Sequence, residues 1–297
     1  MTKNVFVSIM GKANVGKSSL MNYIMGEKIA IVTNKPQTTR NRITGILTED
    51  DLQYVFIDTP GLHKPKSKLG DYMVKEAKQS IAGADVVVMV VEWFGDLSEV
   101  ETALIESLKT SSLPVILVIN KIDTLVEKEQ LLKKIAEVSK LCKFDAVVPI
   151  SAKTGEGVKD LLKEVKKHSV NGPHFFDDDA LTDMPERALM AEIIREKLLL
   201  SLREEIPHGT AVMIEKMHQR ETSNIMDIEA VIVCEKDSHK GIIIGKGGKM
   251  LKEISTKARL DMEAFLGIKV NLKCFVRIKE GWRDSEIQLK NFGFVEK

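Results

Sequence analysis

The stretch Gly11-Lys12-Ala13-Asn14-Val15-Gly16-Lys17-Ser18 decides the fold of the N-terminal half of this chain. It follows a largely apolar run over 5–10 and fits the pattern G-x-x-x-x-G-K-[ST]. Glycines allow a tight turn, so successive backbone N–H groups and a helix N-terminus can point at a phosphate. Lys17 would contact the β- and γ-phosphates, and the Ser18 hydroxyl would bind Mg²⁺. A glycine-rich turn with a chance lysine is the alternative, but the strand before it favours a phosphate-binding loop that includes Ser19.

A second buried strand ends in Asn120-Lys121-Ile122-Asp123, and this motif indicates which nucleotide base is bound. Asp123 can accept hydrogen bonds from N1–H and the 2-amino group of guanine. Adenine lacks both donors and would leave a desolvated carboxylate unpaired. We expect Lys121 to lie along the base and Asn120 to tie this loop to the phosphate loop. A later apolar run ends in Ser151-Ala152-Lys153, whose backbone N–H groups suit the guanine carbonyl oxygen.

The third element is a hydrophobic strand over 52–57 that is followed by Asp58-Thr59-Pro60-Gly61 and Leu62. We expect Asp58 to hold a water of the Mg²⁺ ion and the Gly61 N–H to face the γ-phosphate. A polar segment, Gln37-Thr38-Thr39-Arg40, lies between the first and third elements. One of its threonines would complete the Mg²⁺ coordination when a γ-phosphate is present, and we favour Thr39 over Thr38.

In this order, the motifs resemble those of the translation-factor-related GTPases. Ras-like members carry a water-orienting glutamine where this chain has Leu62, so we assign no catalytic residue and expect slow intrinsic turnover. Asn14 together with Leu62 also resembles members that use a K⁺ ion beside the phosphates. For Asn14, a turn residue with left-handed backbone is an equally good interpretation.

Composition and length fit an ordinary soluble, cytosolic protein of two domains. The chain has 297 residues, 43% of them hydrophobic, and a formal net charge of +1. Its three cysteines lie in apolar contexts and read as reduced, buried side chains rather than a disulfide or a zinc site. No run is long enough for a membrane span, and the N-terminus lacks the apolar core of a signal peptide.

Strand and helix patterns alternate over the first half. A hairpin is expected over 43–58, and continuous apolar runs over 84–91, 115–119 and 146–150 are typical of parallel strands that are covered on both faces. Amphipathic segments lie near 70–82, 98–111, 127–141 and 157–168. We predict a doubly wound α/β GTPase domain over 1–170, with a mixed, mostly parallel sheet and ligand loops at the strands' C-terminal ends.

Residues 171–186 break this pattern. Asn171-Gly172-Pro173-His174 is followed by three consecutive aspartates at 177–179 and by Met184-Pro185. Few apolar contacts can form there, so we predict a linker. The aspartates read as a solvated charge run rather than a metal site.

A smaller α+β domain is predicted over 187–297, with a helix over 188–204 and strands over 210–219, 227–235 and 269–279. Gly245-Lys246-Gly247-Gly248 satisfies G-x-x-G between an apolar helical turn and an amphipathic helix. Such a loop lets a single-stranded backbone approach closely, and the order of elements resembles the bacterial, type II KH domain. We expect Lys249 and Lys252 to join this loop in RNA binding.

Local charge favours the same prediction. The segment 236–283 holds twelve Lys/Arg against five Asp/Glu, a difference of +7 in a chain whose net charge is +1. Concentrated basic charge gives phosphate affinity without sequence choice. A solvated basic face on an unrelated α+β domain is the alternative.

Throughout its length, the chain resembles the Era family, down to the closing Lys279-Glu280-Gly281-Trp282-Arg283. The resemblance implies a GTPase that uses GTP, GDP and Mg²⁺, binds the 3′ region of 16S ribosomal RNA and acts in 30S subunit assembly. It also implies a monomer with peripheral attachment to the cytoplasmic membrane. Ala13 departs from the proline that many members carry there. A related tRNA-modifying GTPase and an RNA-binding module with a degenerate G domain are the alternatives.

Overall fold

A computed structural model describes residues 1–35, 38–62 and 67–294. The chain forms two compact units. The first comprises Met1–Ala30, Thr39–Pro65 and Met73–Asp183, and the second comprises Ile31–Thr38, Lys66–Tyr72 and Met184–Lys297.

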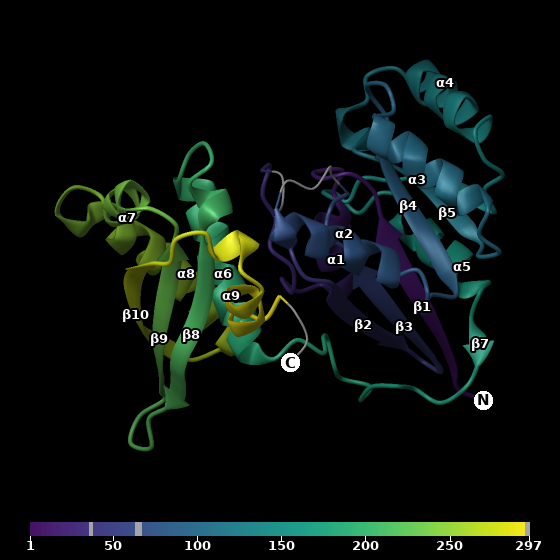
Figure 1. Ribbon diagram of the computed structural model, residues 1–297. Coiled ribbons are helices and arrows are strands. Elements are labelled where there is room, and N and C mark those ends of the chain that lie inside the picture. The colour runs from purple at the N-terminus through teal and green to yellow at the C-terminus, as the bar shows by residue number, and fades with distance from the viewer. Residues whose placement is uncertain (36–37, 63–66, 295–297) are drawn as a thin grey trace. The chain divides into compact units, whose positions relative to one another are not determined.

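One mixed sheet forms the centre of the first unit, with the strand order β2-β3-β1-β4-β5-β6 (Figure 1). Neighbouring strands in this order run parallel, except for β2 and β3, which form the predicted antiparallel hairpin. The mostly parallel α/β fold is therefore confirmed. The strands are β1 (Lys3–Met10), β2 (Ile43–Glu49), β3 (Leu52–Asp58), β4 (Val86–Glu92), β5 (Val115–Asn120) and β6 (Ala146–Pro149).

Helices alternate with these strands. β4 and β5 are buried along almost their whole length, as continuous apolar runs require. α3 and α4 pack on them in one apolar cluster. Ser98 and Glu101 start α3 with a capping box, in which each side chain bonds the other's backbone N–H. The helices are α1 (Lys17–Met25), α2 (Lys68–Gln79), α3 (Glu99–Lys109), α4 (Lys128–Ser139) and α5 (Val158–Lys166).

The start of the predicted linker makes more contacts than its composition suggests. β7 (Val170–Asn171) pairs antiparallel with the beginning of β1, and the Phe175 ring lies 5.0 Å from that of Phe6. The Gln53 side chain accepts hydrogen bonds from the backbone of Phe175 and Phe176. The expectation of few apolar contacts is wrong here, because the aromatic ring and the Gln53 amide hold the segment. The domain boundaries themselves stay a prediction.

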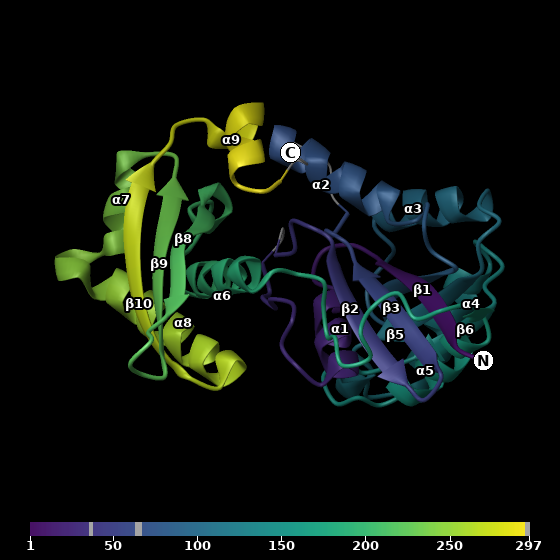
Figure 2. The same ribbon diagram turned by 90° about the horizontal axis from the view of Figure 1, so that it is seen from below.

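The second unit contains a three-stranded sheet in the order β10-β9-β8 (Figure 2). β10 runs parallel to β9, whereas β8 runs antiparallel to it. α6, α8 and the inner sheet face share one apolar core, which includes Ile194, Ile232 and Ala258. The elements are α6 (Glu186–Ser201), β8 (Ala211–Gln219), β9 (Ile225–Cys234), α7 (Asp237–Ile244), α8 (Lys249–Leu266), β10 (Lys269–Ile278) and α9 (Glu286–Asn291).

Other predictions can be compared with the described residues. All three cysteines are free, with Cys234 buried and Cys142 and Cys274 half-buried rather than fully buried. Across the described ranges, no helix has both the length and the hydrophobicity that crossing a bilayer requires. Nor do those ranges hold a cluster of three His, Cys, Asp or Glu side chains arranged to bind a metal.

Candidate functional site

The phosphate-binding loop joins β1 to α1 and is closely packed. Gly11 (φ +152°) and Gly16 (φ +102°) have backbone conformations that favour glycine. A Cβ on Gly11 would collide with the Val90 carbonyl oxygen, and one on Gly16 with the Asn120 amide. α1 begins directly after Gly16, which has no side chain to cap the helix. The first N–H groups of α1 are therefore suited to an anion.

Lys17 is buried at the base of this loop. Its Nζ donates to the carbonyl oxygens of Gly11 at 3.2 Å and Lys12 at 3.0 Å. Burial lowers the pKa of the Lys17 ammonium, and the negative charge of Asp58 partly opposes that shift. The Lys17 ammonium therefore bonds loop carbonyl oxygens in place of water. A phosphate oxygen would bind it more strongly, because hydrogen bonds between two charged groups are stronger than those to a neutral carbonyl.

Three predicted metal-site residues meet beside Lys17. The Ser18 hydroxyl donates to Asp58 Oδ2 at 2.6 Å and lies 2.9 Å from the Thr39 hydroxyl. Asp58 is fully buried, and this burial raises the pKa of its carboxyl, although Lys17 and the Ser18 hydrogen bond oppose the shift. Its buried Oδ1 has no hydrogen-bond partner within the described part of the chain. The oxygen donors fit a hard cation and its bound water.

The turn after β3 packs on the phosphate loop. A Cβ on Gly61 would lie 2.7 Å from the Cα of Ala13, and the Leu62 N–H donates to the Gly11 carbonyl at 3.3 Å. Thr59 is buried and donates to the Ile9 carbonyl at 2.9 Å. Pro60 is also buried. The turn therefore abuts the phosphate loop, whereas Gln37 of the threonine segment lies outside the described residues.

Asn120 joins three loops at the end of β5. Its Nδ2 donates to the Val15 carbonyl of the phosphate loop at 2.7 Å, and its Oδ1 accepts from the Ala152 N–H at 2.9 Å. The Ile122 N–H donates to the Ile150 carbonyl at 3.2 Å. The Ser151 hydroxyl donates to Asp123 Oδ1 at 2.8 Å. The sequence motifs for phosphate and base are thus brought to one edge of the sheet.

One detail differs from expectation, and another agrees with one of two open interpretations. The Ser151 and Ala152 N–H groups already donate to Glu156 and Asn120, so the predicted contact to a guanine oxygen narrows to exposed Lys153. Asn14 has φ +68°, which the turn interpretation predicted. Sequence reasoning also missed Glu92, which contacts Lys12 and Lys121. A single carboxylate at the C-terminal end of an apolar strand is the signal that could have identified it.

The G-x-x-G loop of the second unit is open to solvent. Gly247 (φ +61°) and Gly248 (φ +76°) form a short turn between α7 and α8, and a Cβ on either would meet nothing within 4 Å. Lys246 and the nearby Lys249 and Lys252 are exposed. In the described ranges, none of these three lysines forms an ion pair. They therefore remain available to phosphates.

Several other cations in the basic segment are already paired. Arg277 and Arg283 contact Glu215 and Glu235, which lie outside the counted window of 236–283. The sequence excess of +7 therefore overstates the local charge, because acidic partners come from elsewhere in the fold. The prediction of RNA binding depends on the lysines near the G-x-x-G loop that form no ion pair in the described ranges, namely Lys246, Lys249 and Lys252.

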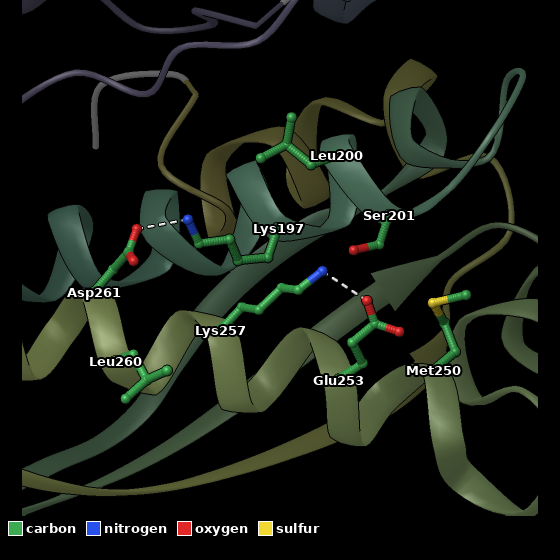
Figure 3. Close-up of a pocket in the computed structure, with 8 residues that line it drawn as sticks. All are labelled: Lys197, Leu200, Ser201, Met250, Glu253, Lys257, Leu260 and Asp261. Atoms are coloured by element: carbon green, nitrogen blue, oxygen red, sulfur yellow. Dashed lines mark hydrogen bonds and ion pairs between the residues drawn. The ribbon is translucent and has the colours of Figure 1, made fainter.

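A cavity of about 410 Å³ lies between α6 and α8 (Figure 3). Lys197 Nζ lies 2.5 Å from Asp261 Oδ2, and Lys257 Nζ lies 2.6 Å from Glu253 Oε1. Both cations are neutralised within the cavity, so it offers no free charge to a phosphate. The lining residues are Lys197, Leu200, Ser201, Met250, Glu253, Lys257, Leu260 and Asp261.

Comparisons with known proteins agree with this geometry. A family model described as 50S ribosome-binding GTPase matches residues 6–121, and a KH domain model matches residues 205–283. A protein named GTPase Era from Clostridioides difficile (strain 630) is 48% identical over 297 residues, with 100% of both chains covered. This chain belongs to the Era family. Another Era relative, from Clostridium novyi (strain NT), is 49% identical over 296 residues, with 100% of both chains covered.

Solved Era structures also match this chain over its whole length. One is a crystal structure of Era in complex with MgGDPNP and nucleotides 1506–1542 of 16S ribosomal RNA. It has a TM-score of 0.96 and 36% identity, and covers 100% of both chains. A second, a single-substitution variant of Aquifex aeolicus Era bound to GDP·AlF4⁻, has a TM-score of 0.95 and 36% identity, and covers 99% of this chain and 100% of that one.

Proposed function

We propose that this Era-family protein binds GTP, hydrolyses it to GDP and phosphate, and binds 16S ribosomal RNA during 30S subunit assembly. The observation that carries the GTP part is the Asn120 side chain, which joins the phosphate loop to the base loop through hydrogen bonds of 2.7 and 2.9 Å. A nucleotide would then bind across loops whose spacing is already set.

Each loop has a distinct task in this proposal. The 11–19 loop encloses the phosphates with its N–H groups, and Lys17 exchanges its carbonyl partners for β- and γ-phosphate oxygens. Asp123 selects guanine, and the Ser151 hydroxyl holds that carboxylate in place. The Gly61 N–H faces the γ-phosphate.

Ser18 and Thr39 would hold Mg²⁺, and Asp58 would hold a water bound to it. Their oxygen donors favour this, as does the buried Asp58 Oδ1, which has no hydrogen-bond partner among the described residues. When bound, the ion neutralises negative charge on the β- and γ-phosphates. We also propose that a K⁺ ion binds beside Asn14, in addition to Mg²⁺.

The RNA part rests on the second unit. The open space beside Gly247 and Gly248 allows a nucleic-acid backbone to approach, and the exposed Lys246, Lys249 and Lys252 supply charge. The Era relative that was crystallised with nucleotides 1506–1542 of 16S ribosomal RNA supports the choice of RNA. A monomer in the cytoplasm, with peripheral membrane attachment, is proposed from the family resemblance alone. A tRNA-modifying relative is the second candidate, but the KH match over 205–283 favours the first.

The test of the GTP site is Asp123→Asn. An amide donates to the 2-position of xanthine but not to that of guanine, so GTP affinity should fall about 100-fold while xanthosine triphosphate binding improves. A direct binding titration with both nucleotides measures this. Asp160→Asn, at an exposed aspartate in the same unit, is the matched control. Unchanged GTP affinity in Asp123→Asn would refute the assignment.

A further inference from the structure

Glu92 lies at the C-terminal end of β4, between two lysines from separate loops. Its Oε2 is 3.3 Å from Nζ of Lys12 in the phosphate loop, and its Oε1 contacts Nζ of Lys121 in the base loop. The Glu92 side chain is only 11% exposed. One carboxylate therefore serves both ends of the proposed nucleotide site.

A second carboxylate completes the cluster. Glu101 is buried, and its Oε2 lies 3.6 Å from Lys12 Nζ while also accepting hydrogen bonds from Ser98. Two lysines thus face two glutamates, so the cluster is neutral. Without Glu92, two ammonium groups would remain near one fixed carboxylate, and their repulsion would be poorly screened in this half-buried region.

The two residues after Glu92 also support the base loop. The Trp93 N–H donates to the Asn120 carbonyl at 3.3 Å, and its indole N–H donates to the Thr124 hydroxyl at 2.9 Å. Lys121 Nζ lies 5.6 Å from the centre of the Phe94 ring, within range of a cation–π contact. Three consecutive residues therefore contact the loop that carries Asp123.

If Glu92 only stabilised the fold, an ion pair with one of the two lysines would be enough. Here the partners come from the two loops that would hold opposite ends of one ligand. Because Glu92 fixes its ammonium group, Lys121 holds its alkyl stem in one position before the nucleotide binds. Less side-chain conformational entropy of Lys121 is then lost on binding. Lys12 is held in the same way at the phosphate end.

We propose that Glu92 is a positioning residue for guanine-nucleotide binding, which acts by holding Lys12 and Lys121. This inference rests on the proposed nucleotide site. Glu92 contacts neither Lys17 nor the Ser18–Asp58 pair in the described residues, so its effect falls on binding rather than on hydrolysis.

The experiment measures GDP dissociation and affinity for Glu92→Gln in the full chain. We expect affinity to fall about tenfold through faster dissociation, a size found for directly coupled neighbours. The hydrolysis rate at saturating GTP should stay within about twofold of wild type, since Glu92 makes no direct contact with Lys17 or Asp58 among the described residues. Glu106→Gln, which breaks an exposed ion pair with Lys109, is the matched control.

A mutant cycle separates positioning from a general loss of structure. In a Lys12→Met/Lys121→Met background, Glu92→Gln should have no further effect on GDP affinity. An equal loss in both backgrounds, or wild-type affinity for Glu92→Gln alone, would overturn the inference. Wild-type affinity of the double lysine variant would instead refute the assignment of these lysines to the nucleotide site. If Glu92→Gln does not fold, Glu92→Asp keeps the charge on a shorter side chain and should lose affinity in the wild-type background only.

Discussion

At the scale of single residues, Leu62 has a structural role beside the proposed γ-phosphate position. Its side chain packs against the apolar cluster of β4, β5, α3 and α4, and its N–H bonds the Gly11 carbonyl. A leucine cannot orient water through a hydrogen bond. Charge stabilisation would then have to come from a cation or a partner protein.

We therefore predict that hydrolysis is slow and responds to K⁺. Multiple-turnover assays in K⁺ and in Na⁺ at equal ionic strength should differ by about 100-fold, the order expected from one added charge-stabilising contact. Asn14→Ala should remove the difference without abolishing GTP binding. Equal rates in the two salts would eliminate the potassium proposal and leave the GTPase assignment intact.

At the scale of elements, Glu263 links α8 to β10. Its Oε1 accepts from the Val270 N–H at 3.1 Å and from Arg259 at 2.8 Å, while Oε2 lies 3.4 Å from Lys269 Nζ. The backbone hydrogen bond, followed by the Arg259 contact, lowers the pKa of the Glu263 carboxyl. A lowered pKa stabilises the fold above the unfolded-state pKa, and this contribution disappears as pH falls through the folded-state value.

Glu263→Gln should accordingly lower Tm at pH 7 by a few degrees, and this difference should shrink at pH 3, where the carboxyl is increasingly protonated. Differential scanning calorimetry of both proteins at the two pH values measures the change. Glu253→Gln serves as control on the same helix, because Glu253 pairs only with exposed Lys257 among the described ion pairs. A Tm difference for Glu263→Gln that stays constant between pH 7 and pH 3 would contradict this account.

Apolar runs predicted the strands to within one or two residues, because burial on both faces leaves a continuous signature. β4 was expected over 84–91 and occupies Val86–Glu92. The motifs also identified most of the candidate site, since glycines and charged side chains at fixed spacing report local backbone requirements. The Glu92 contacts could not be predicted, because they join residues 80 and 29 positions apart and depend on side-chain direction. The packing of Phe175 on Phe6 could not be predicted for the same reason.

At the scale of the whole molecule, each unit has its own apolar core. The cluster around β4 and β5 and the cluster of α6, α8 and β9 have no residue in common. Separate cores predict that a change at the G-x-x-G loop leaves the nucleotide site folded.

Replacing both Lys246 and Gly247 by aspartate should sharply reduce affinity for a 16S 3′-end RNA while leaving GTP affinity at the wild-type value. Negative charge would repel the phosphates, and the longer side chain would block the approach of the backbone. Electrophoretic or fluorescence titration measures the affinity of each variant for this RNA. Lys279→Gln, at a more distant exposed lysine, should weaken binding modestly for any sequence and lower the salt slope by about one. Wild-type RNA binding by the folded aspartate variant would require the second unit to be reassigned to protein interactions.

The position of Asn120 has a consequence for hydrogen exchange. Its amide holds the Val15 carbonyl and the Ala152 N–H together, so neither loop can open without breaking the same side-chain bridge. The Ala152 amide proton is released to solvent when its hydrogen bond to Asn120 Oδ1 opens, and that opening becomes rarer when the Asn120 side chain is held firmly at its Val15 end. A ligand that contacts only the phosphate end would therefore slow exchange at Ala152 without touching it. The protection of one backbone amide reports whether the opposite end of the pocket is filled.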